Sequence, residues 1–315
     1  MKTAHDDHPT LDQAAEILRG GGICAFPTET VYGLGADATN SDAVLAVYEA
    51  KGRPRFNPLI VHCADREMAE RLVTFPAGAE ALAALWPGPL TLVLPRRADA
   101  GISDIVTAGL DTLAVRIPAH PLAQSLIRAV GRPLAAPSAN PSGKLSPTTA
   151  AQVRRAFGGR VPVLDGGPCQ AGLESTIVAV DGERLVQLRA GAMSREEIAF
   201  AVGRPVEVAP KDANVAAPGM LRSHYAPAAD LRLDAAEPLP GEAYLAFGPS
   251  AVAEGPRCRN LSPSGDLHEA ARNLFSALHE IDASGVARIA VAPIPDSGLG
   301  EAINDRLRRA AAPRD

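Results

Sequence analysis

The sequence predicts an α/β fold with two structural units. Short apolar runs alternate with amphipathic segments, which is the pattern of strands separated by helices. At 315 residues the chain is longer than a typical single domain. Periodicity is lost and prolines recur from Gly203 to about Ala229, so we predict one unit over residues 1–202, a linker over 203–229 and a smaller unit over 230–315.

Composition and charge describe a soluble globular protein. Apolar residues make up 46% of the chain and charged residues 21%, and no apolar run approaches membrane-spanning length. The formal net charge of −5 argues against a surface devoted to nucleic acid, although it allows a local basic cleft. The polar, acidic N-terminus indicates no signal peptide. The cysteines lack metal-ligand spacing, so we expect reduced thiols in a cytoplasmic protein: Cys24, Cys63, Cys169 and Cys258.

Helical spacing and turn residues define the elements of the first unit. Thr10 is placed to cap the first helix, and Ser194 with Glu197 forms a capping-box pattern at the last one. We predict helices over residues 11–19, 42–51, 65–73, 77–85, 120–130, 148–157 and 194–202. We predict strands over residues 22–26, 59–61, 90–94, 112–118, 176–180 and 184–188, the last two as a hairpin, with short strands beginning at 133 and 161.

A polar loop follows the first predicted strand. Residues 27–36 hold two threonines, a glutamate, a tyrosine and two glycines. At the carboxyl edge of an open sheet such a loop forms a pocket wall, where Thr28 and Thr30 donate to a carboxylate or phosphate and the glycines let the backbone approach the ligand. The alternative is a strand-to-helix turn with solvated polar residues.

Three cations then occur within five residues: Lys51, Arg53 and Arg55. Two prolines forbid a continuing helix, so we expect the cations on an extended loop, and no acid occurs between residues 51 and 62. In an acidic chain this local excess predicts an anionic ligand, with a solvated charged turn as the alternative. His62, taken alone, is an ordinary strand-end histidine.

Arg116 stands amid apolar residues in a predicted strand. Because a buried unpaired cation is costly, Arg116 either meets an acidic side chain or binds a ligand carboxylate, and the sequence leaves both open. Further along, residues 137–147 form a loop of small, hydroxylated and proline residues that suits a phosphate or ribose, or is a plain surface excursion. Ser146 in this loop is placed to cap the following helix.

The linker carries an unusual cluster of side chains. Residues 217–227 combine Met220, Arg222, His224 and Tyr225, and composition alone does not decide between a linker and a lid. Beyond it we predict a small α/β unit, with strands over residues 243–247 and 288–292 and helices over 266–281 and 300–311.

Seven motifs occur in order along the chain: PTETVYGLG at 27–35, KGRPRFNPLIVH at 51–62, WPGPLT at 86–91, VRIP at 115–118, APSAN at 136–140, EST at 174–176 and HYAP at 224–227. Together they closely resemble the Sua5/YrdC family, and their joint spacing is far more specific than a lone glycine pattern. The resemblance implies a YrdC-like, twisted, open mixed sheet with flanking helices and a concave cationic cavity. It also implies a small Rossmann-like C-terminal domain.

The activity that the resemblance implies is L-threonylcarbamoyladenylate synthesis. Such enzymes combine L-threonine, bicarbonate and ATP, with Mg²⁺ on the phosphates, to give the adenylate and pyrophosphate. The product enters the pathway to N6-threonylcarbamoyladenosine in tRNA through a downstream tRNA threonylcarbamoyl transferase, so we expect neither stable tRNA binding nor membrane contact. Three anionic reactants require a concentrated cationic clamp.

The resemblance also implies roles for individual residues. L-Threonine would be held by Thr30, His62, Arg116, the backbone of Ala136, and Ser175. Lys51 and Arg53 would be the catalytic cations beside the phosphates. ATP would be held by Arg53, Asn57, Thr112, Ser138, Ser146, Arg189 and Tyr225. The linker that carries Tyr225 would then act as an active-site lid, and no metal-ligating residue is implied.

Two other functions compete with this hypothesis. An RNA-binding protein would use the cationic concave sheet without adenylate chemistry, but the acidic net charge and the lack of interleaved aromatic residues weigh against it. A related carbamoyl-adenylate enzyme of metalloenzyme maturation carries additional zinc-finger and acylphosphatase-like modules, and the sequence contains neither.

Overall fold

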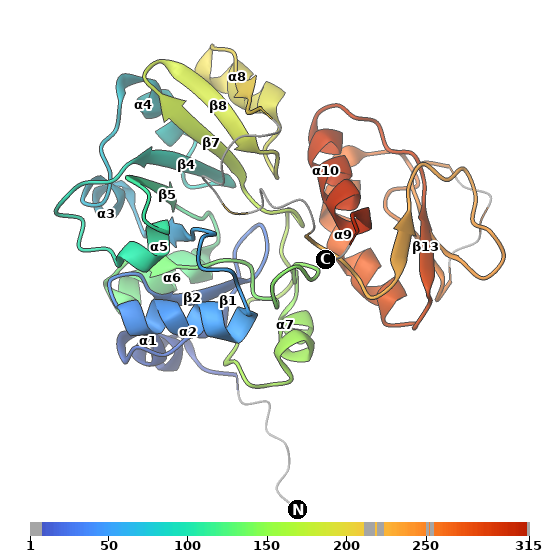
Figure 1. The fold of residues 1–315 in the computed structure, drawn as a ribbon, viewed down its shortest axis with the longest axis horizontal. Coiled ribbons are helices and arrows are strands. Elements are labelled where there is room, and N and C mark those ends of the chain that lie inside the picture. Colours follow the sequence, from blue (N-terminus) through green and yellow to red (C-terminus); the bar gives the residue numbers. More distant parts are fainter. Residues whose placement is uncertain (1–7, 211–217, 219–223, 250–251, 253–254, 314–315) are drawn as a thin grey trace, which may run out of the picture.

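The computed structural model describes residues 8–210, 218, 224–249, 252 and 255–313. Figure 1 shows two α/β units side by side, the larger built from the N-terminal part of the chain and the smaller from the C-terminal part. The larger unit contains a nine-stranded mixed sheet, and the smaller one a four-stranded parallel sheet. The α/β prediction is therefore confirmed.

The large sheet has the strand order β1-β2-β6-β3-β5-β4-β7-β8-β9. At its centre β3 and β5 run parallel, with His62 opposite Arg116, so both strands end in a polar residue at the same edge. The predicted hairpin of β7 and β8 is confirmed. The strands are β1 (Cys24–Phe26), β2 (Gly33–Asp37), β3 (Ile60–His62), β4 (Leu90–Pro95), β5 (Thr112–Arg116), β6 (Leu134–Ala135), β7 (Thr176–Asp181), β8 (Arg184–Arg189) and β9 (Glu207–Val208).

The helices around this sheet follow their sequence signals closely. Thr10 caps α1 and Ser194 caps α8, as predicted. Both caps are capping boxes with the residue three positions on, which was predicted for Ser194. The predicted cap at Ser146 is wrong, because Thr149 caps α7. The helices are α1 (Leu11–Arg19), α2 (Ser41–Lys51), α3 (Arg66–Glu70), α4 (Ala77–Ala83), α5 (Asp104–Thr107), α6 (Pro121–Val130), α7 (Ala150–Phe157) and α8 (Arg195–Val202).

The predicted pocket loop at residues 27–36 is partly wrong. Its second half is strand β2, which pairs antiparallel with β1. A Cβ atom on Gly35 would lie 2.7 Å from Cε1 of Phe26, so this glycine makes room for the Phe26 ring rather than for a ligand. The strand expected from residue 161 also fails to extend, since it contributes only the bridge between Ala25 and Val163.

The core of the larger unit lies between the sheet and its helices. Fully buried side chains come from α1 (Leu18), β1 (Phe26), β2 (Leu34), β3 (Val61) and α6 (Leu126). All four cysteines are buried, and Cys24, Cys63 and Cys169 form no disulfide, in keeping with the reduced thiols predicted from the sequence. None of the described helices is both long and apolar enough to cross a membrane.

The smaller unit confirms both predicted helices and adds two short strands to the predicted pair. Its sheet order is β10-β13-β11-β12, and Figure 1 places α9 and α10 on the side that faces the larger unit. Whether this unit is Rossmann-like stays a prediction. Its elements are β10 (Asp230–Arg232), β11 (Ala243–Ala246), β12 (Cys258–Asn260), α9 (Leu267–Asp282), β13 (Arg288–Val291) and α10 (Leu299–Ala311).

The two units share a buried apolar cluster. Val31, Leu145 and Leu173 of the larger unit belong to the same cluster as Phe275 of α9. The two units approach closely at Gly172, where a Cβ atom would lie 2.5 Å from the Ala271 carbonyl oxygen. The predicted boundary at residue 202 stays a prediction, although β9 extends the larger sheet to Val208. Two stretches of the predicted linker, residues 211–217 and 219–223, lie outside the described residues.

Candidate functional site

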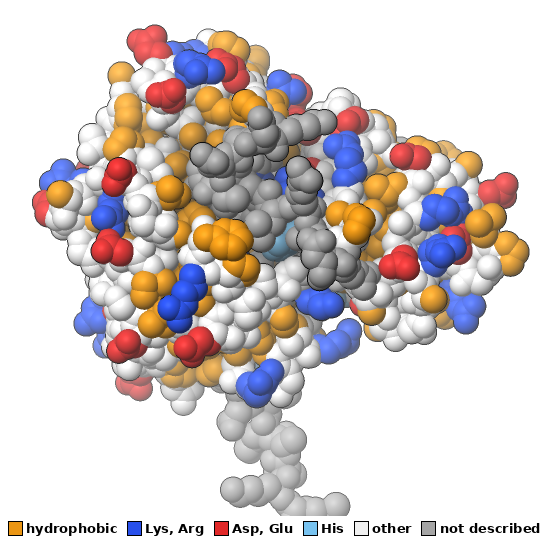
Figure 2. All heavy atoms as spheres, in the orientation of Figure 1, with side chains coloured by type: hydrophobic (Ala, Val, Ile, Leu, Met, Phe, Trp, Pro, Cys, Tyr) orange, Lys and Arg blue, Asp and Glu red, His pale blue; other side chains and the backbone are white. Residues whose placement is uncertain are grey.

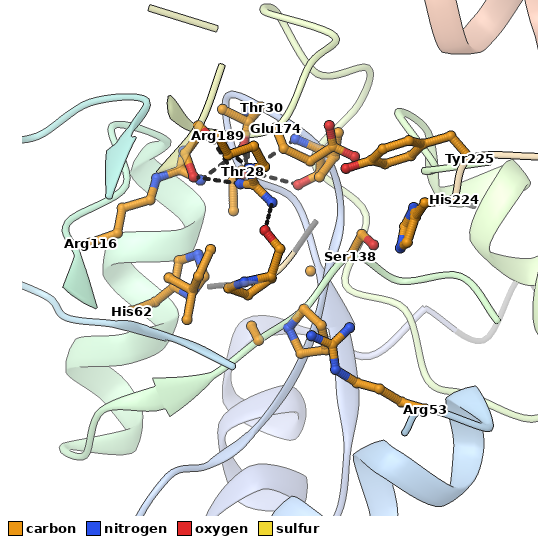
Figure 3. A pocket seen from close by; sticks show the side chains of 17 residues that line it. Thr28, Thr30, Arg53, His62, Arg116, Ser138, Glu174, Arg189, His224 and Tyr225 are labelled. Carbon is orange, nitrogen blue, oxygen red and sulfur yellow. Dashed lines mark hydrogen bonds between the residues drawn. The ribbon is translucent and has the colours of Figure 1, made fainter. Parts of the chain in front are cut away.

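A small cavity of about 40 Å³ lies at the sheet edge where β3 and β5 end. Figure 3 shows Arg116, Thr30 and Glu174 at one side, Arg53 at another, and His224 and Tyr225 beside Ser138. Segments far apart in the sequence build it: Thr28, Thr30, Val31, Gly33, Arg53, Ile60, His62, Arg116, Ala136, Pro137, Ser138, Glu174, Ser175, Arg189, Pro218, His224 and Tyr225.

Arg116 meets an acidic side chain, which decides between the two alternatives left open by the sequence. Its Nη2 donates to Oε1 of Glu29 at 2.5 Å, its Nη1 to the Thr30 hydroxyl at 2.9 Å, and its Nε to the Gly88 carbonyl at 3.1 Å. Burial raises the pKa of Glu29, but Arg116 outweighs burial and lowers it. The ion pair therefore holds the guanidinium in one orientation while leaving it on the cavity wall.

His62 lies beside Arg116 in a dry environment. Its ring packs edge-on against Phe26, with ring centroids 6.1 Å apart, and its Nδ1 has no partner among the described residues. Burial, assisted by the positive charge of Arg116, lowers the pKa of His62 to about 3. The imidazole is therefore neutral and offers an unused nitrogen to a ligand.

Arg53 and Arg189 are buried without a carboxylate partner among the described residues. Arg53 donates to the carbonyls of Asn57 and Pro58 at 3.1 and 2.8 Å. Arg189 donates to the Ser175 carbonyl, to the Ser175 hydroxyl and to the Pro218 carbonyl. Burial lowers the pKa of Arg53 to about 10 and lowers that of Arg189, yet both stay protonated near neutral pH. They give the cavity an excess of positive charge.

Three smaller groups complete the predicted set on the cavity wall. The Ser175 hydroxyl lies 2.7 Å from that of Thr91, and Ser138 lies on the segment after β6. The Ala136 amide already donates to the Ile60 carbonyl, so only its carbonyl is left to face a ligand. Thr28 donates to the Val31 carbonyl at 2.7 Å, so it shapes the loop.

Lys51 is the last residue of α2, as the predicted helix over residues 42–51 requires, and the capping glycine Gly52 follows it in the left-handed conformation. The expectation that Lys51 also belongs to an extended loop is wrong. Its ammonium donates to the carbonyls of Ser138, at 2.6 Å, and Asn140, and it does not line the cavity. Burial, with Arg53 nearby, lowers the pKa of Lys51. Arg55 is exposed and also lies off the cavity wall.

Three predicted ATP residues lie around the cavity rather than on its wall. Asn57 is buried, and neither its amide nitrogen nor its amide oxygen has a partner among the described residues. Thr112 begins β5, at the opposite end of that strand from Arg116. The Ser146 hydroxyl donates to Oε1 of Glu174 at 2.5 Å. Of these three, Asn57 alone presents an unused buried amide.

Sequence reasoning assigned no role to three side chains of this region. Glu174 lines the cavity, and only its place in the EST motif marked it. His224 also lines the cavity, with its ring centroid 4.0 Å from that of Tyr225, and burial lowers its pKa to about 3. Arg306 of α10 reaches Glu174 from the other unit, and no local pattern in the sequence marks it.

Comparison with known proteins follows the same division into two parts. Residues 16–191 match the Sua5, YciO and YrdC family profile, described as telomere recombination, and residues 193–312 match that of the threonylcarbamoyl-AMP synthase C-terminal domain. The threonylcarbamoyl-AMP synthase of Bacillus subtilis strain 168 is 43% identical over 97% of this chain and 94% of its own length. The chain belongs to the Sua5 family of threonylcarbamoyl-AMP synthases.

A solved Sua5 structure shares the whole fold. The crystal structure of Pyrococcus abyssi Sua5 complexed with L-threonine matches with a TM-score of 0.87 and 40% identity, over 96% of this chain and 94% of that one. The Schizosaccharomyces pombe synthase is 38% identical over 96% of this chain and 88% of its own length. The Sua5 synthases are ATP-using nucleotidyltransferases, so the predicted family and enzyme class are confirmed.

Proposed function

We propose that this chain makes threonylcarbamoyl-AMP and pyrophosphate from L-threonine, bicarbonate and ATP in the cavity between Arg116 and Arg53. The single observation that carries this proposal is the pair of buried guanidiniums, Arg53 and Arg189, whose described partners are carbonyl and hydroxyl oxygens. A buried cation without an anion is costly, and an entering triphosphate removes that cost. The adenylate would then serve a downstream tRNA threonylcarbamoyl transferase.

L-Threonine would bind at the Arg116 side of the cavity. The oriented Arg116 guanidinium receives its carboxylate beside Thr30, while the Ala136 carbonyl accepts from its amine. The neutral His62 and the Ser175 hydroxyl contact the rest of the ligand. The relative from P. abyssi whose structure holds L-threonine supports this choice of amino acid.

ATP would bind along the part of the cavity that runs from Arg53 to Arg189. These cations and Ser138 face the phosphates, and Tyr225 closes the wall above them. Asn57, Thr112 and Ser146 contact more distant parts of the nucleotide. Lys51 acts through the backbone, because its ammonium fixes the Ser138 and Asn140 carbonyls and so shapes the loop that holds Ser138.

Positioning and charge stabilisation would supply most of the rate. The neutral threonine amine attacks the carbon of bicarbonate, water leaves, and a carbamate forms. A carbamate oxygen then attacks the α-phosphorus, and the bond to pyrophosphate breaks. Arg53 and Arg189 stabilise the negative charge that develops on the phosphate oxygens, in a site that excludes water. Both reaction steps would thus take place in the proposed concave cationic cavity.

Magnesium would enter with ATP as part of the substrate. The described residues contain no group of three His, Cys, Asp or Glu side chains that fits a metal cage. Glu174 is the carboxylate on the described cavity wall, and both its oxygens are bonded, one to Ser146 and one to Arg306. Mg²⁺ commonly retains waters and binds through substrate phosphates, which fits this donor set.

The segment over residues 203–229 would act as a lid. Pro218, His224 and Tyr225 of this segment line the cavity, whose 40 Å³ holds water but no nucleotide, so part of the wall has to move for ATP to enter. Closure protects the carbamate, which decomposes in water. Tyr225→Ala is expected to release threonine-dependent AMP and pyrophosphate without the adenylate, whereas Tyr225→Phe keeps coupled turnover.

The proposed function is tested by pyrophosphate release from ATP with mass detection of the adenylate. Release has to require both L-threonine and bicarbonate, and the product has to carry threonine. Turnover that is independent of threonine contradicts the proposal. Tight tRNA binding without ATP turnover would favour an RNA-binding function, although Arg53, Arg116 and Arg189 are buried, and Figure 2 shows acidic and basic side chains mixed over the visible face.

A further inference from the structure

We infer that Arg306 of the C-terminal unit is a positioning residue for the nucleotide side of the cavity. It neutralises Glu174 and supports Tyr225, so the larger unit does not form a complete ATP site alone. This inference rests on the proposed function and adds to it a part for the second unit, to which the sequence assigned none. It is carried by contacts that cross between the units.

The first contact is a buried ion pair. Nε of Arg306 donates to Oε2 of Glu174 at 2.9 Å, and the two side chains are 1% and 7% exposed. Nη1 of Arg306 donates to Asp305 on the same helix at 2.8 Å. Arg306 is the largest of the fully buried side chains in the described part of the chain, so the fold holds it in one place.

The second contact supports the aromatic wall of the cavity. The Arg306 guanidinium carbon lies 5.2 Å from the centroid of the Tyr225 ring, within the range of a cation–π interaction. The Tyr225 ring also packs against Phe275 of α9 and against the adjacent His224, with ring centroids 5.7 and 4.0 Å apart. Tyr225 has a φ of 63°, a conformation that a non-glycine residue keeps only when its surroundings impose it. Two of these surrounding side chains, Arg306 and Phe275, belong to the second unit.

The charge of Glu174 explains why Arg306 is needed. A carboxylate on the wall of a polyphosphate site repels its ligand unless a cation compensates it. Burial raises the pKa of Glu174, but Arg306 first and Arg189 second outweigh burial and lower it, so the carboxylate is ionised. Without Arg306, Arg189 is the remaining described cation that lowers the pKa of this carboxyl group. The titratable and charged groups around Glu174 are Arg189, His224, Tyr225, Asp305 and Arg306.

The decisive experiment is a double-mutant cycle in the full-length protein, with the KM for ATP as the measured quantity. Arg306→Met is expected to raise this KM at least tenfold in the wild-type background. In the Glu174→Gln background the same substitution is expected to change it less than threefold, because the carboxylate that needs neutralising is gone. Arg308→Met is the matched control, since it lies on the same helix and pairs only with exposed Asp296.

A pH profile separates charge neutralisation from a loss of packing. In Arg306→Met the KM for ATP is expected to fall as the pH drops from 8 to 6, because protonation removes the charge of a Glu174 whose pKa has risen. The KM of the wild type is expected to lack this trend. If Arg306→Met does not fold, Arg306→Gln replaces it in the same double-mutant cycle. The melting temperatures of all variants are measured.

Equal effects of the Arg306 substitution in both backgrounds would overturn the inference, as would a wild-type KM in Arg306→Met. These outcomes leave the proposed function intact. That function fails instead if the wild-type protein releases no pyrophosphate with threonine and bicarbonate, whatever the variants do.

Discussion

The two ends of the cavity hold their arginines differently. At one end Arg116 is paired with Glu29 and bonded to Thr30, so its direction is set before any ligand arrives. Across the cavity Arg53 donates to the carbonyls of Asn57 and Pro58, which carry no formal charge. This contrast indicates that the first end recognises the shape of a small ligand and the second attracts a polyanion.

Replacing Arg116 is expected to have the greatest consequence. Arg116→Ala removes the fork that orients threonine and leaves Glu29 buried without its cation. We expect threonine-dependent pyrophosphate release to fall about a thousandfold and the free energy of unfolding to fall by about 3–5 kcal/mol. Activity assays and urea denaturation measure the two. The matched double variant Glu29→Gln/Arg116→Ala is expected to regain stability without activity, and near-normal turnover would remove Arg116 from the site.

Replacing Arg53 is expected to separate activity from stability. Arg53→Ala removes a buried cation with no carboxylate partner among the described residues, so we expect kcat/KM for ATP to fall about a hundredfold and the free energy of unfolding to change by less than about 1 kcal/mol. The control is Arg55→Ala, two residues on and exposed, which is expected to change neither. A stability loss as large as that of Arg116→Ala would show that the two ends are alike.

Lowering the pH is expected to destabilise both ends of the cavity, because each end holds a buried histidine. The folded-state pKa values of His62 and His224 are lowered to about 3, so the unfolded chain binds more protons between pH 6.5 and 3. Their contribution to stability is therefore present above pH 6.5 and lost as the pH falls. We expect each to remove roughly 2 kcal/mol of unfolding free energy between pH 7 and 5.

Measuring the unfolding free energy of His62→Gln and His224→Gln at pH 7 and pH 5 shows how much of this loss comes from each end of the cavity. Each variant is expected to lack about half of the histidine contribution. A pH dependence unchanged in His224→Gln would mean that the nucleotide end is open to water.

The smallest change in ATP affinity is expected from a substitution at the contact between the two units. Gly172 has a φ of 74°, and an added Cβ atom would lie 2.5 Å from the Ala271 carbonyl oxygen and the Arg272 backbone. Gly172→Ala is expected to destabilise the protein by about 1–3 kcal/mol and to raise the KM for ATP about threefold, with the KM for threonine unchanged. Gly167→Ala is the control, since Gly167 has a φ of 79° but no neighbour within 4 Å. Equal effects of both variants would exclude a role for the interface.

Local patterns in the sequence determined the fold class, most helices and the family. Capping boxes at Thr10 and Ser194 and the hairpin of β7 and β8 depend on residues close in sequence, so they could be predicted. The motifs also located the cavity-lining residues Thr30, Arg53, His62, Arg116 and Arg189, and Thr30, His62 and Arg189 each follow a predicted strand. That placement at one sheet edge is a property of the strand pattern itself.

The tertiary structure alone decided which charges meet. The sequence pairs Arg116 with no particular acid, and Glu29 becomes its partner only through packing across 87 positions. Packing likewise brings together Arg306 and Glu174, which lie 132 positions apart. Lys51, which was predicted to lie beside the phosphates, instead donates to two backbone carbonyls. Charge pairing depends on distances between distant segments, and a linear pattern of residue types carries no such distances.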